Sequence, residues 1–108
     1  MTVKELSETD IFKSVVVPCP NREICGVYIG DLLSWVMGRA QSDDAWLTIM
    51  SNKNILAVAS LADTACIILA EGVEIDDDIA SAAEAKQINI LSCKCGMYEA
   101  AIALGKLI

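Results

Sequence analysis

Short apolar runs alternate along the chain with stretches of helical periodicity, and this alternation predicts an α/β fold. Runs rich in β-branched and aliphatic residues predict strands over Lys13–Val17, Ile24–Ile29, Ala45–Met50, Ala65–Ala70 and Ile88–Leu91. Helices are predicted over Val3–Asp10, Asp31–Gly38, Ile55–Ala62, Asp76–Gln87 and Met97–Leu107. Such alternation favours right-handed crossovers, so we expect a compact α/β domain with a mainly parallel sheet and helices on both of its faces.

Several predicted elements begin or end at residues suited to that position. Thr2 followed by Glu5 matches the capping-box pattern of a helix start. Asp31 and the aspartates from Asp76 onward suit the positive ends of the helices that follow them. Pro18 ends the first strand, and since proline cannot donate to a sheet ladder, we expect an edge or a turn there.

The helix predicted over Asp31–Gly38 is apolar almost all the way round, with Ser34 as the polar side chain in its middle. A helix of this kind needs cover on more than one side. The domain's own sheet can supply one cover and a second protein the other. The pattern therefore predicts a homodimer interface formed by Leu32, Trp35, Val36 and Met37, although Trp35 is equally compatible with a place in the monomer's core.

Composition and charge narrow the class of protein. The 108 residues suit one domain over 1–108, and 55% of them are hydrophobic, enough for one core without disulfides or metal. The net charge of −7, with scattered basic residues, excludes a nucleic-acid-binding surface. The acidic excess over Glu71–Asp78 favours solubility, with an acidic binding patch or a metal site as the alternatives.

The chain has no run of the ~18–20 apolar residues that a membrane span needs. Its first residues also lack the apolar core of a signal peptide. We therefore expect a cytoplasmic protein whose five cysteines stay reduced, with no membrane contact and no cofactor.

Polar junctions follow three predicted strands and precede three predicted helices. Since parallel strands end at one edge of a sheet, where ligands bind α/β domains, these junctions predict a site for a small anion or nucleotide. The candidate ligand-binding residues are Ser51, Asn52, Asn54, Glu71, Gly72, Ser92 and Lys94. The alternative is that Ser and Asn at these positions only cap helices.

Two further candidates remain open. Cys93 and Cys95, near a predicted helix start, suggest a thiol-based redox or metal-handling protein as an alternative function, or else two small core and loop residues. Gly26 and Gly30 are more typical of backbone geometry than of phosphate binding. Histidine is absent, so no Ser-His or Cys-His pair exists, and we expect no enzymatic activity.

The run Arg22–Met37, with Ala45–Ile49, Asn54–Ala59 and Ala65–Leu69, resembles the DRTGG domain family. This family is related to the N-terminal domain of bacterial HPr kinase/phosphorylase and accompanies phosphotransacetylases and some inorganic pyrophosphatases. The resemblance implies a small α/β domain that dimerises and regulates or scaffolds without catalysing. The chain departs from the signature at Asn21, Cys25 and Val27, where the family has Asp, Thr and Gly.

Overall fold

The computed structural model describes residues 1–108 and confirms the α/β fold. The elements in chain order are α1 (Val3–Ser7), β1 (Lys13–Val16), β2 (Gly26–Ile29), α2 (Leu33–Arg39), β3 (Asp44–Thr48), α3 (Asn54–Ala62), β4 (Cys66–Leu69), α4 (Asp77–Ala85), β5 (Ile90–Ser92) and α5 (Met97–Leu107). No helix is both long enough and apolar enough to cross a lipid bilayer.

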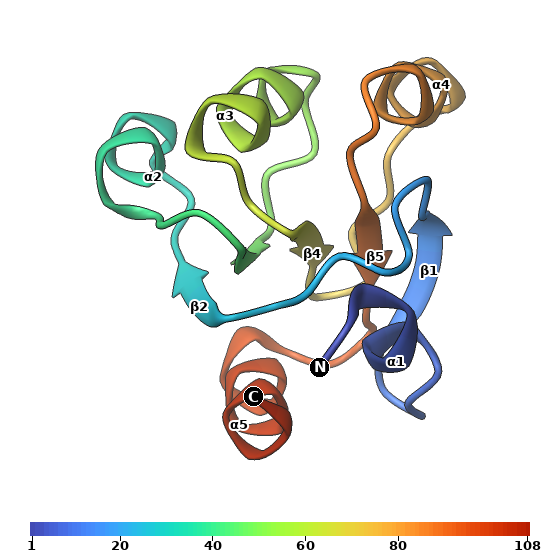
Figure 1. The fold of residues 1–108 in the computed structure, drawn as a ribbon, viewed down its shortest axis with the longest axis vertical. Helices are drawn as coiled ribbons and strands as arrows, with labels where there is room; N and C mark the ends of the chain where they lie inside the picture. The colour runs from blue at the N-terminus through green and yellow to red at the C-terminus, as the bar shows by residue number, and fades with distance from the viewer.

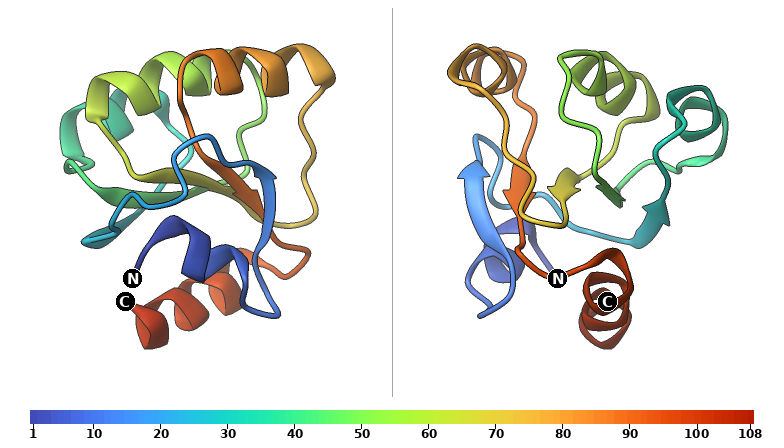
Figure 2. Two further views of the ribbon diagram at one scale, coloured as in Figure 1. Left: turned by 45° about the vertical axis from the view of Figure 1, so that its right-hand side comes forward. Right: turned by 180° about the vertical axis from the view of Figure 1, so that it is seen from behind.

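The five strands form one sheet in the order β1-β5-β4-β3-β2 (Figure 1). Strands β2 to β5 are parallel, whereas β1 pairs antiparallel with β5 at one edge. Helices α2, α3 and α4 cover one face of the sheet, and α1 and α5 cover the other (Figures 1 and 2). The predicted two-sided cover is therefore present, and β1 and β2 are the two edge strands.

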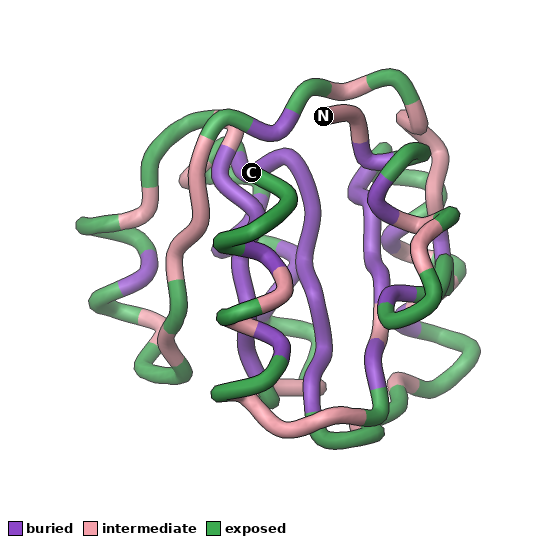
Figure 3. The backbone as a smooth tube through the Cα atoms, turned by 90° about the horizontal axis from the view of Figure 1, so that it is seen from below, coloured by how far each residue is buried: buried purple, intermediate pink, exposed green.

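Successive residues of the central strands pack alternately into two separate hydrophobic cores, one on each face of the sheet. In β3, Ala45 and Leu47 pack on the side of α1 and α5, while Trp46 between them packs under α2 and α3. Strand β4 repeats this pattern, with Ile68 on the first side and Ile67 on the second. Figure 3 shows these central strands as the continuously buried part of the chain. Burial on both faces explains why they are apolar without alternation.

Three local predictions need correction. Helix α1 keeps the predicted capping box between Thr2 and Glu5, but it ends at Ser7 rather than Asp10. Helix α2 begins at Leu33, and Asp31 does not cap it. The Asp31 carboxylate instead accepts hydrogen bonds from the Thr48 hydroxyl (2.7 Å) and the Ile49 amide (3.0 Å). Asp31 thus ties the end of β2 to the end of β3.

Candidate functional site

The carboxyl ends of β2, β3, β4 and β5 share one edge of the sheet, as their parallel pairing requires. The predicted ligand-binding residues all lie at this edge, most of them on loops. Ser92 is the last residue of β5, and Asn54 is the first residue of α3 and lines neither of the hollows described below. The structure nevertheless divides them between two separate hollows and a closed junction. The first hollow lies between α3 and α4, and the second between the start of β1 and the β5–α5 loop.

The α3–α4 hollow has a volume of about 420 Å³ and contains two of the predicted residues, Ser51 and Asn52. Its other lining residues are Lys53, Asp76, Asp78, Ile79 and Ala82. Asn52 Oδ1 accepts from the Asn54 amide (2.9 Å), and Asp76 Oδ1 accepts from the Ile79 amide (2.9 Å). These helix starts are therefore capped by the chain itself, and two aspartates face any anion that enters.

Glu71 and Gly72 form the closed junction between the two hollows. The Glu71 amide donates to the Cys95 carbonyl (2.9 Å), and the Gly72 amide donates to the Cys93 carbonyl (3.0 Å). Both residues adopt left-handed backbone conformations, with φ of 61° and 70°. They join the loops after β4 and β5, so they line neither hollow.

The second hollow, which we call the Lys13–Lys94 hollow, has a volume of about 360 Å³. It is lined by Asp10, Ile11, Lys13, Ser92, Cys93, Lys94 and Cys95. Lys13 stands opposite Ser92 because β1 pairs antiparallel with β5. Neither lysine forms an ion pair within the chain. Ser92 and Lys94 were expected at this edge from the sequence, whereas Lys13 was not, since no local pattern indicates which distant strand β1 joins.

The Cys93 thiol of this hollow is a poor nucleophile. Burial, a hydrogen bond to Cys95 and repulsion from it raise the pKa of the Cys93 thiol to about 12. Burial likewise raises the pKa of Cys66 to about 12. A thiol with such a pKa is almost wholly protonated near pH 7, and the thiolate is the reactive form. No group of three or more His, Cys, Asp or Glu side chains is placed to hold a metal ion.

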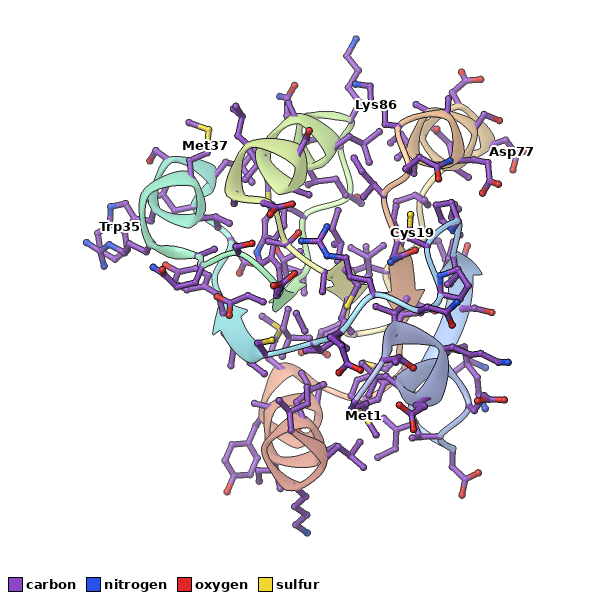
Figure 4. The ribbon with its side chains drawn as sticks, in the orientation of Figure 1. Met1, Cys19, Trp35, Met37, Asp77 and Lys86 are labelled. Carbon is purple, nitrogen blue, oxygen red and sulfur yellow. The ribbon has the colours of Figure 1, made fainter.

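Large apolar side chains are exposed on α2 and at Leu32, the residue just before it. The exposed fractions are 57% for Leu32, 52% for Trp35 and 48% for Met37. Val36, by contrast, lies on the inner side of α2 and is fully buried in the core. Its predicted place in a dimer interface is therefore wrong. Figure 4 shows that Trp35 and Met37 leave the helix in different directions. The guanidinium of Arg39 lies 3.7 Å above the Trp35 ring.

A polar cluster that sequence analysis missed lies at the opposite edge, where the strands begin. Arg22 donates from Nε (3.0 Å) and Nη2 (2.8 Å) to Asp43 Oδ1, and from Nη2 to the Asp63 carbonyl (2.7 Å) and Oδ1 (2.9 Å). Asp43 and Asp63 both have positive φ values, 69° and 59°. Arg22 therefore clamps two strained turns onto the segment before β2.

Gly26 has a structural role at this same edge. A Cβ atom on Gly26 would lie 2.6 Å from Oδ1 of Asp44, whose side chain is buried and accepts from the Gln41 amide (2.8 Å). Arg22 and Gly26 thus hold the backbone together at the edge remote from both hollows. Close packing, not phosphate binding, accounts for the glycine.

Comparison with known proteins gives two positive findings. Residues 24–107 match the family model described as the DRTGG domain. The fold is similar to a crystal structure of the CBS and DRTGG domains of the regulatory region of Clostridium perfringens pyrophosphatase, complexed with its activator diadenosine tetraphosphate. The TM-score is 0.65 at 11% identity, over 83% of this chain and 40% of that one, so this chain spans about two fifths of its neighbour's length. No curated protein matches the chain.

Proposed function

Because the chain belongs to the DRTGG domain family, we propose that it is a non-catalytic regulatory domain that acts as a homodimer. The observation that carries this proposal is the α2 outer face, defined by Leu32 and Trp35, which lie three residues apart at the start of α2. Each of these side chains is about half exposed. Large apolar side chains gathered on one short helix are typical of a protein–protein interface.

The charge distribution favours a second copy of the chain as the partner. Two copies that each carry a net charge of −7 repel one another, and acidic residues on the surfaces that meet would strengthen this repulsion. Helix α2 has no acidic residue and ends at Arg39. In contrast, α4 begins with Asp77 and Asp78. The α2 outer face is therefore suited to self-association.

Trp35→Glu is expected to convert the dimer to a monomer, because it places a charge where an aromatic side chain is desolvated. Light scattering coupled to size-exclusion chromatography measures the change in mass. Tyr98→Glu is the matched control, since Tyr98 is an exposed aromatic (76%) on α5, at the opposite face of the sheet. Met37→Glu places a charge on another side of α2 (Figure 4) and tests whether the interface extends around the helix. A monomeric wild type, or a Trp35→Glu variant with dimer mass, would contradict the proposal.

We also propose that the regulatory ligand is a small anion or nucleotide held in the Lys13–Lys94 hollow. The two lysines have no competing ion pair, and Asp10 is the one acidic residue that lines this hollow. The structural neighbour is complexed with a nucleotide, diadenosine tetraphosphate. The high pKa of Cys93 disfavours the alternative function based on a reactive thiol.

The double variant Lys13→Gln/Lys94→Gln is expected to bind diadenosine tetraphosphate at least about tenfold more weakly than wild type, because two charge-assisted contacts to phosphate are removed. Isothermal titration calorimetry measures the dissociation constants, with ATP as a second probe. Lys53→Gln, in the α3–α4 hollow, is the control and should leave binding unchanged. Absence of nucleotide binding by the wild type, or a loss caused by Lys53→Gln instead, would refute this assignment.

A further inference from the structure

One edge strand of the sheet has no outer partner and no feature that would keep one away. Strand β2 is last in the strand order and pairs only with β3. Its residues carry no charge and include no proline, and its register with β3 is unbroken. The other edge strand, β1, is as short but has Lys13 and a shift in register, two features that oppose pairing between molecules. The edge at β2 is therefore open to a further strand.

The backbone of β2 offers hydrogen-bonding groups along this edge. The Gly30 amide donates to the Leu47 carbonyl of β3 (3.2 Å). Because every second residue of a strand in a parallel pair bonds to the same neighbour, Tyr28 also faces β3, whereas Val27 and Ile29 face away from it. No loop of the chain bonds to the backbone groups of Val27 or Ile29. Each of these two residues therefore has one N–H and one C=O free for another strand.

A second copy of β2 matches these free groups. In an antiparallel pair of two β2 strands centred on Tyr28, Val27 of one copy lies opposite Ile29 of the other, and the two residues exchange both backbone hydrogen bonds. A two-fold axis relates the copies, so the same pairing occurs twice. The nearest carboxylate, that of Asp31, is held at the end of β3 by the Thr48 hydroxyl. Acidic side chains of the two copies therefore do not meet along the paired strands.

The surface next to β2 supplies the area that a short strand lacks. Stable interfaces bury about 1,200–2,000 Å² in total, more than two strands of this length can cover. Helix α2 lies beside β2 at the same side of the molecule, and Trp35 points outward from that side (Figures 1 and 4). On the other face of the sheet, Ile29 is 46% exposed and would be covered by the partner's Val27. Pairing at this edge therefore buries apolar side chains on both faces.

We infer that the homodimer forms by antiparallel pairing of two β2 strands, which joins the two five-stranded sheets into one continuous sheet. This inference rests on the homodimer proposed above and specifies how its subunits meet. A two-fold axis perpendicular to the sheet keeps both α2 helices on the same face, so the two α2 outer faces come together above the paired strands. The Lys13–Lys94 hollow lies at β1 and β5, on the far side of the sheet, and stays open in such a dimer.

The first test compares Ile29→Lys with Val15→Lys by light scattering coupled to size-exclusion chromatography. Both residues are β-branched and lie on edge strands, with exposed fractions of 46% for Ile29 and 42% for Val15. Ile29→Lys is expected to give a monomer although it lowers the net negative charge, because the two added charges lie close together in the paired strands. Val15→Lys should keep the mass of the dimer. Ile29→Pro, which removes an N–H that the monomer does not use, should also give a monomer.

Hydrogen exchange measured by NMR on the ¹⁵N-labelled wild type gives a second readout that needs no change in β2. In the dimer, the amides of Val27 and Ile29 are expected to exchange as slowly as that of Tyr28, which bonds to β3. In the monomeric Trp35→Glu variant, these two amides should exchange at least about tenfold faster, while the Tyr28 amide stays protected.

The outcomes separate this inference from the homodimer proposal. Fast exchange at Val27 and Ile29 in a wild-type dimer would overturn the inference and leave the edge to a strand of another protein. Dimer mass in both Ile29 variants, with a monomeric Trp35→Glu variant, would also overturn it and would leave a homodimer held by α2 alone. Loss of the dimer in Val15→Lys would show that the effect is not specific to β2 and would count against the inference. A monomeric wild type would contradict the homodimer proposal and this inference together.

Discussion

Trp46→Ala is expected to lower the free energy of unfolding by about 3–5 kcal/mol. Trp46 is the largest fully buried side chain of the chain and packs in the core beneath α2 and α3. Its indole Nε1 donates to the Gly30 carbonyl over 2.9 Å, so it also fixes the loop that leads into α2. A small domain has only about 5–15 kcal/mol of stability in total. Urea denaturation followed by circular dichroism measures the loss.

Trp46→Phe separates the two contributions of this side chain. Phenylalanine retains most of the ring but leaves the Gly30 carbonyl without its donor, so a loss of about 1–2 kcal/mol is expected. If the two variants lose the same stability, the hydrogen bond and not the ring volume holds this loop. If neither variant loses stability, the packing described for Trp46 is wrong.

Arg22→Met is expected to lower the free energy of unfolding by about 1–2 kcal/mol, because it removes charge-assisted hydrogen bonds to Asp43 and Asp63. The Arg22 side chain is 30% exposed, whereas those of Asp43 and Asp63 are 41% and 62% exposed, so water replaces part of these bonds. The control is Arg39→Met, which loses an exposed stacking contact on Trp35 and should cost under about 1 kcal/mol. Equal losses in the two variants would contradict a clamp at Arg22.

The same clamp predicts an acid dependence of stability. Hydrogen bonds from Ser42 and Arg22 hold the pKa of Asp63 below its ordinary value of 3.8. A carboxyl whose pKa is depressed in the folded state contributes stability that is present above its unfolded pKa and is lost as the pH falls through the folded value. The difference between wild type and Arg22→Met should therefore shrink below about pH 4. An undiminished difference at pH 2–3 would exclude a contribution from Asp63.

The order and type of the elements were predictable because each carries its own local pattern. Short apolar runs were sufficient to predict the parallel strands. Helix α5 has the predicted bounds because its helical periodicity and the glycine before it indicate the same start. The family assignment and the two-sided sheet follow from the same residues. The position of β1 did not follow, because its antiparallel pairing with β5 is decided by tertiary packing and not by the residues of β1.

The position of the candidate sites at one edge of the sheet could be predicted, but which residues share a hollow could not. The C-terminal edge was expected from topology, yet which loops share a hollow depends on where the helices leave the sheet. Asp31 illustrates the limit, since an aspartate before a helix can cap it or, as here, bond to the neighbouring strand through Thr48. In an apolar helix as short as α2, the sequence does not show whether Val36 or Trp35 is buried. The position of the helix on the sheet decides that Val36 is covered and Trp35 is exposed.

The pairing of β1 with β5 has a consequence for the order of folding. Lys13 and Ser92 are partners in the sheet although most of the chain lies between them. During synthesis β1 leaves the ribosome long before β5 exists, so it stays without its partner while β2, β3 and β4 are already available to pair. An unpaired strand can pair with strands of other chains and so cause aggregation. Strand β1 has two features that oppose such pairing, the charge of Lys13 and a break in register between Ser14 and Val16. The closure of this longest loop is therefore expected to be the last and slowest step of folding.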